Sequence, residues 1–252
     1  MAIIWQKTHK GIQYQVRTAG NTLRLYTNGV FHSQYNPNKQ ITKGVWDLLM
    51  LPAYFYPPGT IKRILVLGVG GGAVIHLLHN HIQPESIVGV ELNAVHLVVA
   101  KKYFAVSNEK TQLIHADAVK WLESYSGPTL DLIIDDMFGE EKQGATQRAI
   151  PLNRKWFTQI NRHLSRRGMF IVNTHDYACF RNCAYRSNKK VTAYFESVFQ
   201  FTMPHYGNRV FAFLKQSSTT AQLRQRLKQQ SNVPSMKALA SLKFSVRKIP
   251  AA

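Results

Sequence analysis

The sequence predicts an α/β fold, in which a small antiparallel β-domain precedes a doubly wound, mostly parallel sheet. Three observations predict it. From residue 61 onward, short apolar runs alternate with segments of helical spacing, the pattern of a parallel sheet covered by helices on both faces. A glycine-rich turn at residues 68–72 joins the first such run to its helix. Before residue 36, apolar and polar residues alternate around hairpin turns, as in antiparallel strands.

Residues 2–35 predict a meander of three or four antiparallel strands. Asn28-Gly29 is the strongest short hairpin signal, and residues 36–38, Asn-Pro-Asn, end the segment. Thr42 is then placed to cap a helix that runs to Phe55 and that Pro52 shortens or kinks. The alternating apolar positions of the meander are Ile12, Tyr14, Val16, Leu23 and Leu25.

Residues 61–91 predict a nucleotide-binding βαβ unit. Its second strand ends at Glu91, which follows the glycines by roughly 20 residues, as such units require. The glycines let the backbone approach a ligand, and the Glu91 carboxylate can accept the ribose hydroxyls. The alternative is a tight structural turn between a strand and a helix. The unit comprises strand 64–67, the glycines Gly68, Gly70, Gly71 and Gly72, helix 73–81 and strand 87–90.

Further strands and helices alternate until two strands with no helix between them, which predict an antiparallel hairpin. Seven strands ending in this way are typical of the Rossmann-like methyltransferase fold. Residues 139–149 have no periodicity and predict a loop, and the segment from residue 217 predicts a ragged basic tail with a short helix. The later strands are 111–115, 130–134, 169–173, 197–203 and 209–214; the helices are 93–104, one after Asp117, 153–164 and 189–196. The expected domains are residues 1–40 (β-strand domain), 41–216 (Rossmann-like nucleoside-binding domain) and 217–252 (tail).

Acidic residues follow three consecutive strands of the predicted sheet. Because ligands of doubly wound sheets bind at the carboxyl ends of the strands, we expect Glu91, Asp117 and Asp136 to face one site. Asp117 can accept from an adenine amine beside the backbone N–H of Ala118, with Leu92 next to the ribose. Asp136 is expected at the reacting centre; adjacent residues of a strand point to opposite sides, so Asp135 is a weaker candidate. The alternative for each acid, above all Asp117, is a helix N-cap.

The charge is strongly positive, with 32 Lys and Arg against 13 Asp and Glu, a formal net charge of +19. Every acidic residue lies between Asp47 and Glu196, so both ends are basic or neutral. Such a surface attracts polyanions, and nucleic acid is a possible partner; the alternative is a solubility device.

Cys179 and Cys183 fit neither a redox pair nor a zinc pair, so we expect reduced thiols and no metal site. With no secretory signal and no apolar run long enough to span a membrane, we expect a cytoplasmic protein.

Several segments resemble the spermidine synthase (polyamine aminopropyltransferase) family over roughly residues 12–214. They are VLGVGGGA, GVELN, HADAVKWL, DLIIDDMF and PLNRKWFTQINRHLSRRGMFIVNTH, together with Asn28-Gly29 in the β-domain. The resemblance implies a site for decarboxylated S-adenosylmethionine on the glycines and acids, with Asp136 as the catalytic aspartate. It also implies a homodimer.

The departures from this family concern its carboxylates. The family has an aspartate where this chain has Gly71, a second aspartate after the catalytic one, and a Tyr-His-Glu signature where this chain has Val45-Trp46-Asp47. A polyamine site needs several carboxylates to offset the lost hydration of its cations. Free glycine amides at a helix start favour the carboxylate that only intact S-adenosylmethionine carries. The chain is therefore similar to a spermidine-synthase-like methyltransferase.

Our first hypothesis is S-adenosylmethionine-dependent methyl transfer to an unidentified small-molecule acceptor, with Asp136 orienting or deprotonating the nucleophile. Tyr177, His175 and Trp46 are expected to line the acceptor pocket. The second is aminopropyl transfer from decarboxylated S-adenosylmethionine, with Asp47, Glu140 and Glu141 as relocated carboxylates. The third is a basic nucleic-acid-binding protein that retains the fold as a scaffold.

Overall fold

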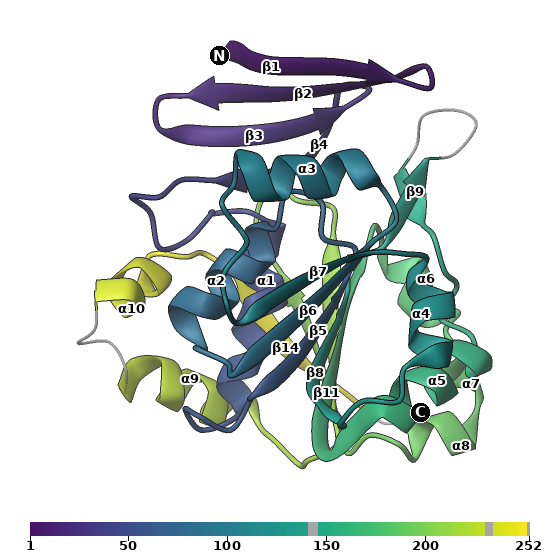
Figure 1. The fold of residues 1–252 in the computed structure, drawn as a ribbon. Coiled ribbons are helices and arrows are strands. Elements are labelled where there is room, and N and C mark those ends of the chain that lie inside the picture. Colours follow the sequence, from purple (N-terminus) through teal and green to yellow (C-terminus); the bar gives the residue numbers. More distant parts are fainter. Residues whose placement is uncertain (141–145, 230–233, 251–252) are drawn as a thin grey trace.

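A mixed eight-stranded sheet forms the centre of the molecule (Figure 1). The computed structural model describes residues 1–140, 146–229 and 234–250. The strand order is β14-β12-β13-β11-β8-β5-β6-β7. The five strands from β11 to β7 are parallel, and β13 and β14 run antiparallel to their neighbours. The strands are β5 (Arg63–Leu67), β6 (Ser86–Glu91), β7 (Thr111–His115), β8 (Leu130–Asp135), β11 (Leu164–Thr174), β12 (Ser197–Thr202), β13 (Arg209–Leu214) and β14 (Ser245–Ile249).

Successive strand residues enter two separate cores, because side chains alternate across a sheet. Ile64 and Val66 pack on one face, whereas Leu65 and Leu67 pack on the other. The first face is covered by α1 (Val45–Met50), the 3-10 helix η1 (Leu51–Phe55), α2 (Ala73–His81), α3 (Ala94–Lys102), α9 (Thr220–Gln229) and α10 (Pro234–Ala240). The second is covered by α4 (Ala118–Ser124), α5 (Arg154–His163), α6 (Tyr177–Arg181), α7 (Ala184–Ser187) and α8 (Lys189–Thr192). The predicted doubly wound architecture is confirmed.

The N-terminal residues form the predicted meander, a four-stranded antiparallel sheet in the order β1-β2-β3-β4. Asn28 and Gly29 both have positive φ, as the tight turn between β3 and β4 requires. This sheet lies at one end of the molecule beside α3 (Figure 1). Two hydrogen bonds fix it there: the Asn93 side chain donates to the Tyr14 hydroxyl at 2.9 Å, and Thr27 bonds His96 at 2.8 Å. The strands are β1 (Ala2–His9), β2 (Ile12–Ala19), β3 (Thr22–Thr27) and β4 (Val30–Tyr35).

The segment predicted as a loop at 139–149 instead contributes to a two-stranded ribbon. Strand β9 (Phe138–Glu140) pairs antiparallel with β10 (Thr146–Arg148). The ribbon is anchored by Arg148, whose guanidinium donates to the buried Asp135 carboxylate at 2.7 Å. Because this ion pair joins residues that lie apart in the sequence, the sequence shows no periodic pattern that would predict the ribbon.

The C-terminal segment, expected to be a ragged tail, packs on the main sheet. Strand β14 pairs with β12 and adds an eighth strand to the seven predicted. Ile249 is buried, and the Arg247 guanidinium donates to the Gln200 side chain at 2.7 Å. The adjacent basic residues Arg247 and Lys248 interrupt the alternation of apolar and polar residues that would have predicted this strand.

Several helix boundaries differ from those predicted. The N-cap of the first helix is Gly44 and not Thr42, and the helix begins at Val45. The buried Asp47 carboxylate accepts the backbone N–H groups of Thr42 and Gly44. Helix α5 ends at His163, and the strand that follows starts at Leu164, so the arginines 166 and 167 lie in β11. The predicted helix 189–196 is shortened to α8, and α6 and α7 precede it. None of the described helices is both long and apolar enough to cross a membrane.

Candidate functional site

A cavity of about 970 Å³ lies where the carboxyl ends of the central strands meet the N-terminal sheet. One wall comes from the glycine turn after β5 and from the ends of β6, β7 and β8. Other parts of the wall come from β1 to β4 and from α1, and His175, Tyr206 and Asn208 also belong to the lining. Of the residues predicted to bind the cofactor, the lining includes Gly68, Gly70, Glu91, Leu92, Asp117, Ala118 and Asp136.

The four glycines of the turn have two different roles. Gly68 and Gly70 line the cavity with positive φ, and a Cβ on Gly68 would lie 2.5 Å from the Asp136 carbonyl oxygen. Gly71 and Gly72, also predicted to contact the cofactor, do not line the cavity. A Cβ on Gly71 would lie 2.1 Å from the Phe104 ring, and one on Gly72 would lie 2.4 Å from Val106. These two glycines allow close packing of the segment after α3.

Glu91 forms part of the cavity wall and also braces the glycine turn. Its Oε2 accepts the backbone N–H groups of Val69 and Gly70, both at 2.9 Å, and its Oε1 accepts that of Asn93 at 2.8 Å. A carboxylate oxygen has two lone pairs, so Oε2 is saturated and Oε1 retains one acceptor position. The neighbouring Leu92 is 70% exposed on the cavity side.

Asp117 combines the two roles weighed for it from the sequence. Its Oδ1 accepts the backbone N–H groups of Val119 and Lys120 as the N-cap of α4. Its side chain also faces the cavity beside Ala118. Because the cap uses Oδ1, the second carboxylate oxygen remains available for a ligand.

The adjacent acids Asp135 and Asp136 point to opposite sides, as predicted. Asp135 is fully buried between the Arg148 guanidinium and the Trp156 indole N–H, at 2.7 and 2.9 Å. Asp136 faces the cavity, where its Oδ1 accepts from the Asn173 amide at 2.8 Å. The Asn208 amide in turn donates to Asn173 at 3.1 Å.

Burial raises the pKa of Asp136 to about 7, and the nearby charges of Asp135 and Glu91 act in the same direction. The hydrogen bond from Asn173 and the charge of Arg148 oppose this shift. A carboxyl group with a pKa near neutrality can accept a proton from a substrate at physiological pH.

Of the three residues expected to line the acceptor pocket, two line the cavity and one does not. Trp46 and His175 line the cavity. Tyr177 does not, because its ring packs near Phe180 and beneath the Arg247 guanidinium.

Of the carboxylates proposed as relocated, Asp47 is fully buried, hydrogen-bonded to its own chain and not part of the cavity lining, although burial and then the charge of Asp47 raise the pKa of Tyr206, which lines the cavity. Glu141 and the side chain of Glu140 lie outside the described residues.

Sequence reasoning missed Asn173, Tyr206 and Asn208, which also line the cavity. Asn173 could have been found, since it lies near the carboxyl end of β11, as the predicted acids do on their strands. Asn208 and Tyr206 lie in the hairpin before β13, and no motif marks them.

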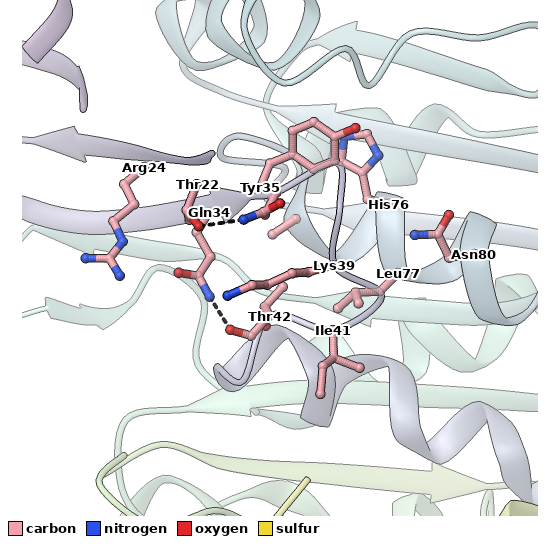
Figure 2. Close-up of a pocket in the computed structure, with 12 residues that line it drawn as sticks. Thr22, Arg24, Gln34, Tyr35, Lys39, Ile41, Thr42, His76, Leu77 and Asn80 are labelled. Atoms are coloured by element: carbon pink, nitrogen blue, oxygen red, sulfur yellow. Dashed lines mark hydrogen bonds between the residues drawn. The ribbon is translucent and has the colours of Figure 1, made fainter. Parts of the chain in front are cut away.

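A second, smaller pocket of about 120 Å³ lies between the N-terminal sheet and α2 (Figure 2). Tyr35 stacks on His76 at 4.0 Å, the Asn36 side chain donates to Thr22, and that of Gln34 donates to the Thr42 carbonyl. None of its described lining residues is a carboxylate or touches the larger cavity's acids. We therefore interpret this pocket as a packing gap between the N-terminal sheet and α2, and not as a functional site.

The family model for the spermine/spermidine synthase domain matches residues 47–225, which include the glycine turn and all the acids of the cavity. The chain belongs to the spermine/spermidine synthase family. The match leaves out the N-terminal sheet and β14, both of which belong to the structure described above.

Known proteins similar to the chain carry two kinds of name. A polyamine aminopropyltransferase of Chromobacterium violaceum is 25% identical over 114 residues, 44% of this chain and 42% of that protein. The mouse eEF1A lysine and N-terminal methyltransferase is 27% identical over 120 residues, 45% of this chain and 17% of that protein. The chain thus spans less than half the length of either relative.

Among solved structures, a probable spermidine synthase from Corynebacterium glutamicum shares the fold with a TM-score of 0.73. The sequence identity is 16%, and the alignment covers 98% of this chain and 91% of that one. Because its coverage includes nearly the whole chain, the likeness extends to the N-terminal sheet and the C-terminal segment.

Proposed function

We propose that this protein is an S-adenosylmethionine-dependent methyltransferase with a non-polyamine acceptor. The observation that carries this proposal is the charge at the acceptor end of the cavity. Three described carboxylates line the cavity, and we assign Glu91 to the ribose and Asp117 to the adenine, which leaves Asp136 for the acceptor. With a pKa of about 7, Asp136 is only partly ionised at neutral pH. A dicationic or larger polyamine needs more negative charge than this to offset its lost hydration.

The glycine turn supports the same choice of cosubstrate. An aspartate at position 71, which the resemblance associates with the aminopropyl amine, has no room here, because a Cβ would already meet Phe104 at 2.1 Å. The free glycine amides expected from the sequence are not available for a ligand carboxylate, because the N–H groups of Val69 and Gly70 donate to Glu91 and that of Ala73 donates to Ser33. The preference therefore rests on position 71. Glu91 and Asp117 retain free acceptor positions for the ribose and the adenine.

When bound, S-adenosylmethionine supplies an electrophilic methyl group on a sulfonium. The chain then has to align the acceptor and remove a proton from it. In our proposal Asp136 would accept that proton when the nucleophile takes the methyl group, whose bond to the sulfonium breaks to leave S-adenosylhomocysteine. Asn173, held by Asn208, fixes the carboxylate for this step through its 2.8 Å hydrogen bond. Trp46 and Tyr206 shield the acceptor from water.

Isothermal titration calorimetry with intact and decarboxylated S-adenosylmethionine tests the choice of cosubstrate. We expect the intact form to bind at least ~10-fold more tightly, which corresponds to about 1.4 kcal/mol. Tighter binding of the decarboxylated form would overturn the preference for methyl transfer.

Aminopropyl transfer is a second candidate, favoured by the names of relatives such as the Chromobacterium violaceum protein. Incubation with putrescine and decarboxylated S-adenosylmethionine tests it directly. Release of methylthioadenosine together with spermidine would support it, and release of neither from a protein that binds the cosubstrate would exclude it for this acceptor.

A further inference from the structure

Three side chains with different metal-binding chemistry converge where β11 leads into α6. They are the imidazole of His175, the carboxylate of Asp176 and the thiol of Cys179, and their ligand atoms all lie within 4.8 Å of one another. Within residues 1–140, 146–229 and 234–250, no other three His, Cys, Asp or Glu side chains form such a group. His175 also lines the large cavity.

Two of the three separations between these atoms, sulfur to nitrogen and nitrogen to oxygen, match those of a tetrahedral zinc site. With Zn–S near 2.3 Å and Zn–N near 2.05 Å, tetrahedral angles place sulfur and nitrogen about 3.5 Å apart, and nitrogen and oxygen about 3.4 Å apart. Here the Cys179 Sγ lies 3.5 and 3.6 Å from the two His175 ring nitrogens. The His175 Nε2 lies 3.5 Å from the Asp176 Oδ2.

The backbone already orients one of these ligands. The Asp176 Oδ1 accepts the backbone N–H of Cys179 at 2.9 Å, which leaves Oδ2 directed at His175. Hydrogen bonds of this kind commonly fix metal-binding carboxylates. The cap of α6 explains Asp176 by itself, but it accounts for neither His175 nor Cys179.

One adjustment is required for binding. Because the sulfur is nearly equidistant from both ring nitrogens, the His175 ring has to rotate so that one nitrogen faces the ion. The His175 and Asp176 side chains are 35% and 50% exposed, so both have room to turn.

We propose that His175, Asp176 and Cys179 form a three-ligand transition-metal site at the edge of the cavity, with zinc as the ion its ligands favour. A thiolate and an imidazole select zinc and similar ions over magnesium or calcium. Three protein ligands leave a fourth position for water or for a group in the cavity, as in catalytic rather than structural zinc sites. This inference goes beyond the transferase proposal and does not depend on it.

Cobalt substitution tests the site without any assay of activity. The 252-residue protein is freed of metal with a chelator and titrated with Co²⁺ in the absence of cosubstrate. We expect an absorption band from thiolate-to-cobalt charge transfer that saturates at one equivalent and is lost when Zn²⁺ is added. Cys179→Ser should abolish the band, and His175→Ala should weaken Co²⁺ binding by more than the 10–100-fold typical of outer-shell changes.

Cys183→Ala is the matched control, because Cys183 is the second cysteine but lies buried outside the cluster. It should retain the band, and thermal melts should show that each variant is folded. Absence of the band at one equivalent, its persistence in folded Cys179→Ser, or its loss in folded Cys183→Ala would each overturn the proposal.

Discussion

At the residue scale, the burial of Asp136 raises its pKa, which makes it a suitable base and also lowers the free energy of unfolding when the carboxylate is ionised. A carboxyl group whose pKa is raised from 3.8 to about 7 binds its proton more tightly in the folded than in the unfolded chain. Tighter proton binding by Asp136 therefore adds its full amount to the free energy of unfolding below pH ~4. This amount is lost as the pH rises through 7. One pKa unit corresponds to about 1.4 kcal/mol, so the cost at pH 8 is up to ~4 kcal/mol, less where water enters the cavity.

Asp136→Asn is expected to lower kcat ~100-fold or more, because it removes the base while keeping the shape of the side chain. The same variant should unfold at a higher denaturant concentration than the wild type at pH 8, and the difference should vanish near pH 4. Activity assays and urea unfolding at the two pH values provide the measurements. A variant that is fully active, or less stable at pH 8, would contradict this account of Asp136.

Asn173→Ala provides a second test that keeps the base in place. The Asn173 hydrogen bond lowers the pKa of Asp136, so its removal should raise that pKa further. The wild-type rate should increase with pH around 7, and the midpoint should move to higher pH in the variant. A pH–rate profile of kcat measures both, and an unchanged midpoint would mean that another group is the base.

Gly71, which the sequence suggested as a cofactor-binding residue, packs against Phe104 and does not line the cavity. We expect Gly71→Ala to destabilise the protein by about 1–3 kcal/mol, because the added methyl group overpacks the Phe104 ring. Gly139→Ala is the matched control, since nothing lies within 4 Å of a Cβ there. Urea unfolding measures both. Equal costs at the two positions would mean that the turn relaxes freely, and the steric argument against an aspartate at position 71 would fail.

At the element scale, the ribbon of β9 and β10 depends on one buried ion pair. The side chains of Arg148 and Asp135 are 5% and 0% exposed, and Arg148 also donates to the Asn173 carbonyl. Arg148→Met would leave Asp135 charged and buried, so we expect a loss of about 3–5 kcal/mol in the free energy of unfolding. Adding Asp135→Asn should recover part of this loss, and urea unfolding of the two variants measures it.

The pair Lys155–Glu123 is the control for this prediction, because its side chains are 80% and 43% exposed. Lys155→Met should cost less than about 1 kcal/mol, as exposed pairs do. If Arg148→Met costs no more than Lys155→Met, the ion pair does not hold the ribbon in place.

The same elements show what the sequence could and could not predict. Runs such as residues 64–67 have a local signal, since a strand buried on both faces is apolar throughout. The alternation of strands with helices predicted a parallel sheet, but the order of its strands comes only from the structure. The acids Glu91, Asp117 and Asp136 were predicted to share a site because each lies at or just after the end of a strand, and all three line the cavity. The pairing of β9 with β10 and the packing of Phe104 against Gly71 depend on contacts between distant residues, which no local pattern contains.

At the scale of the whole molecule, the basic C-terminal segment contributes both to the net charge and to the main sheet. The net charge of +19 attracts polyanions, and this non-specific attraction weakens steeply as salt is added. The C-terminal segment nevertheless has a structural role, because β14 covers the edge of β12. The likeness to the Corynebacterium glutamicum structure extends over 98% of the chain, whereas the family match ends at residue 225.

Ending the chain after Phe244 tests that role. The truncation removes β14, including the buried Ile249, and exposes the edge of β12. Burial of one aliphatic side chain contributes about 1.5–3 kcal/mol, so the loss of the strand should lower Tm by at least ~5 °C. Ending the chain after Pro250 is the control and should leave Tm unchanged.

Four strands separate β14 from β5, so binding of S-adenosylmethionine well below Tm should be preserved in both proteins. An unchanged Tm on loss of β14 would mean that the segment is a tail after all, while loss of binding in the folded truncated protein would mean that the sheet edge and the cavity are coupled.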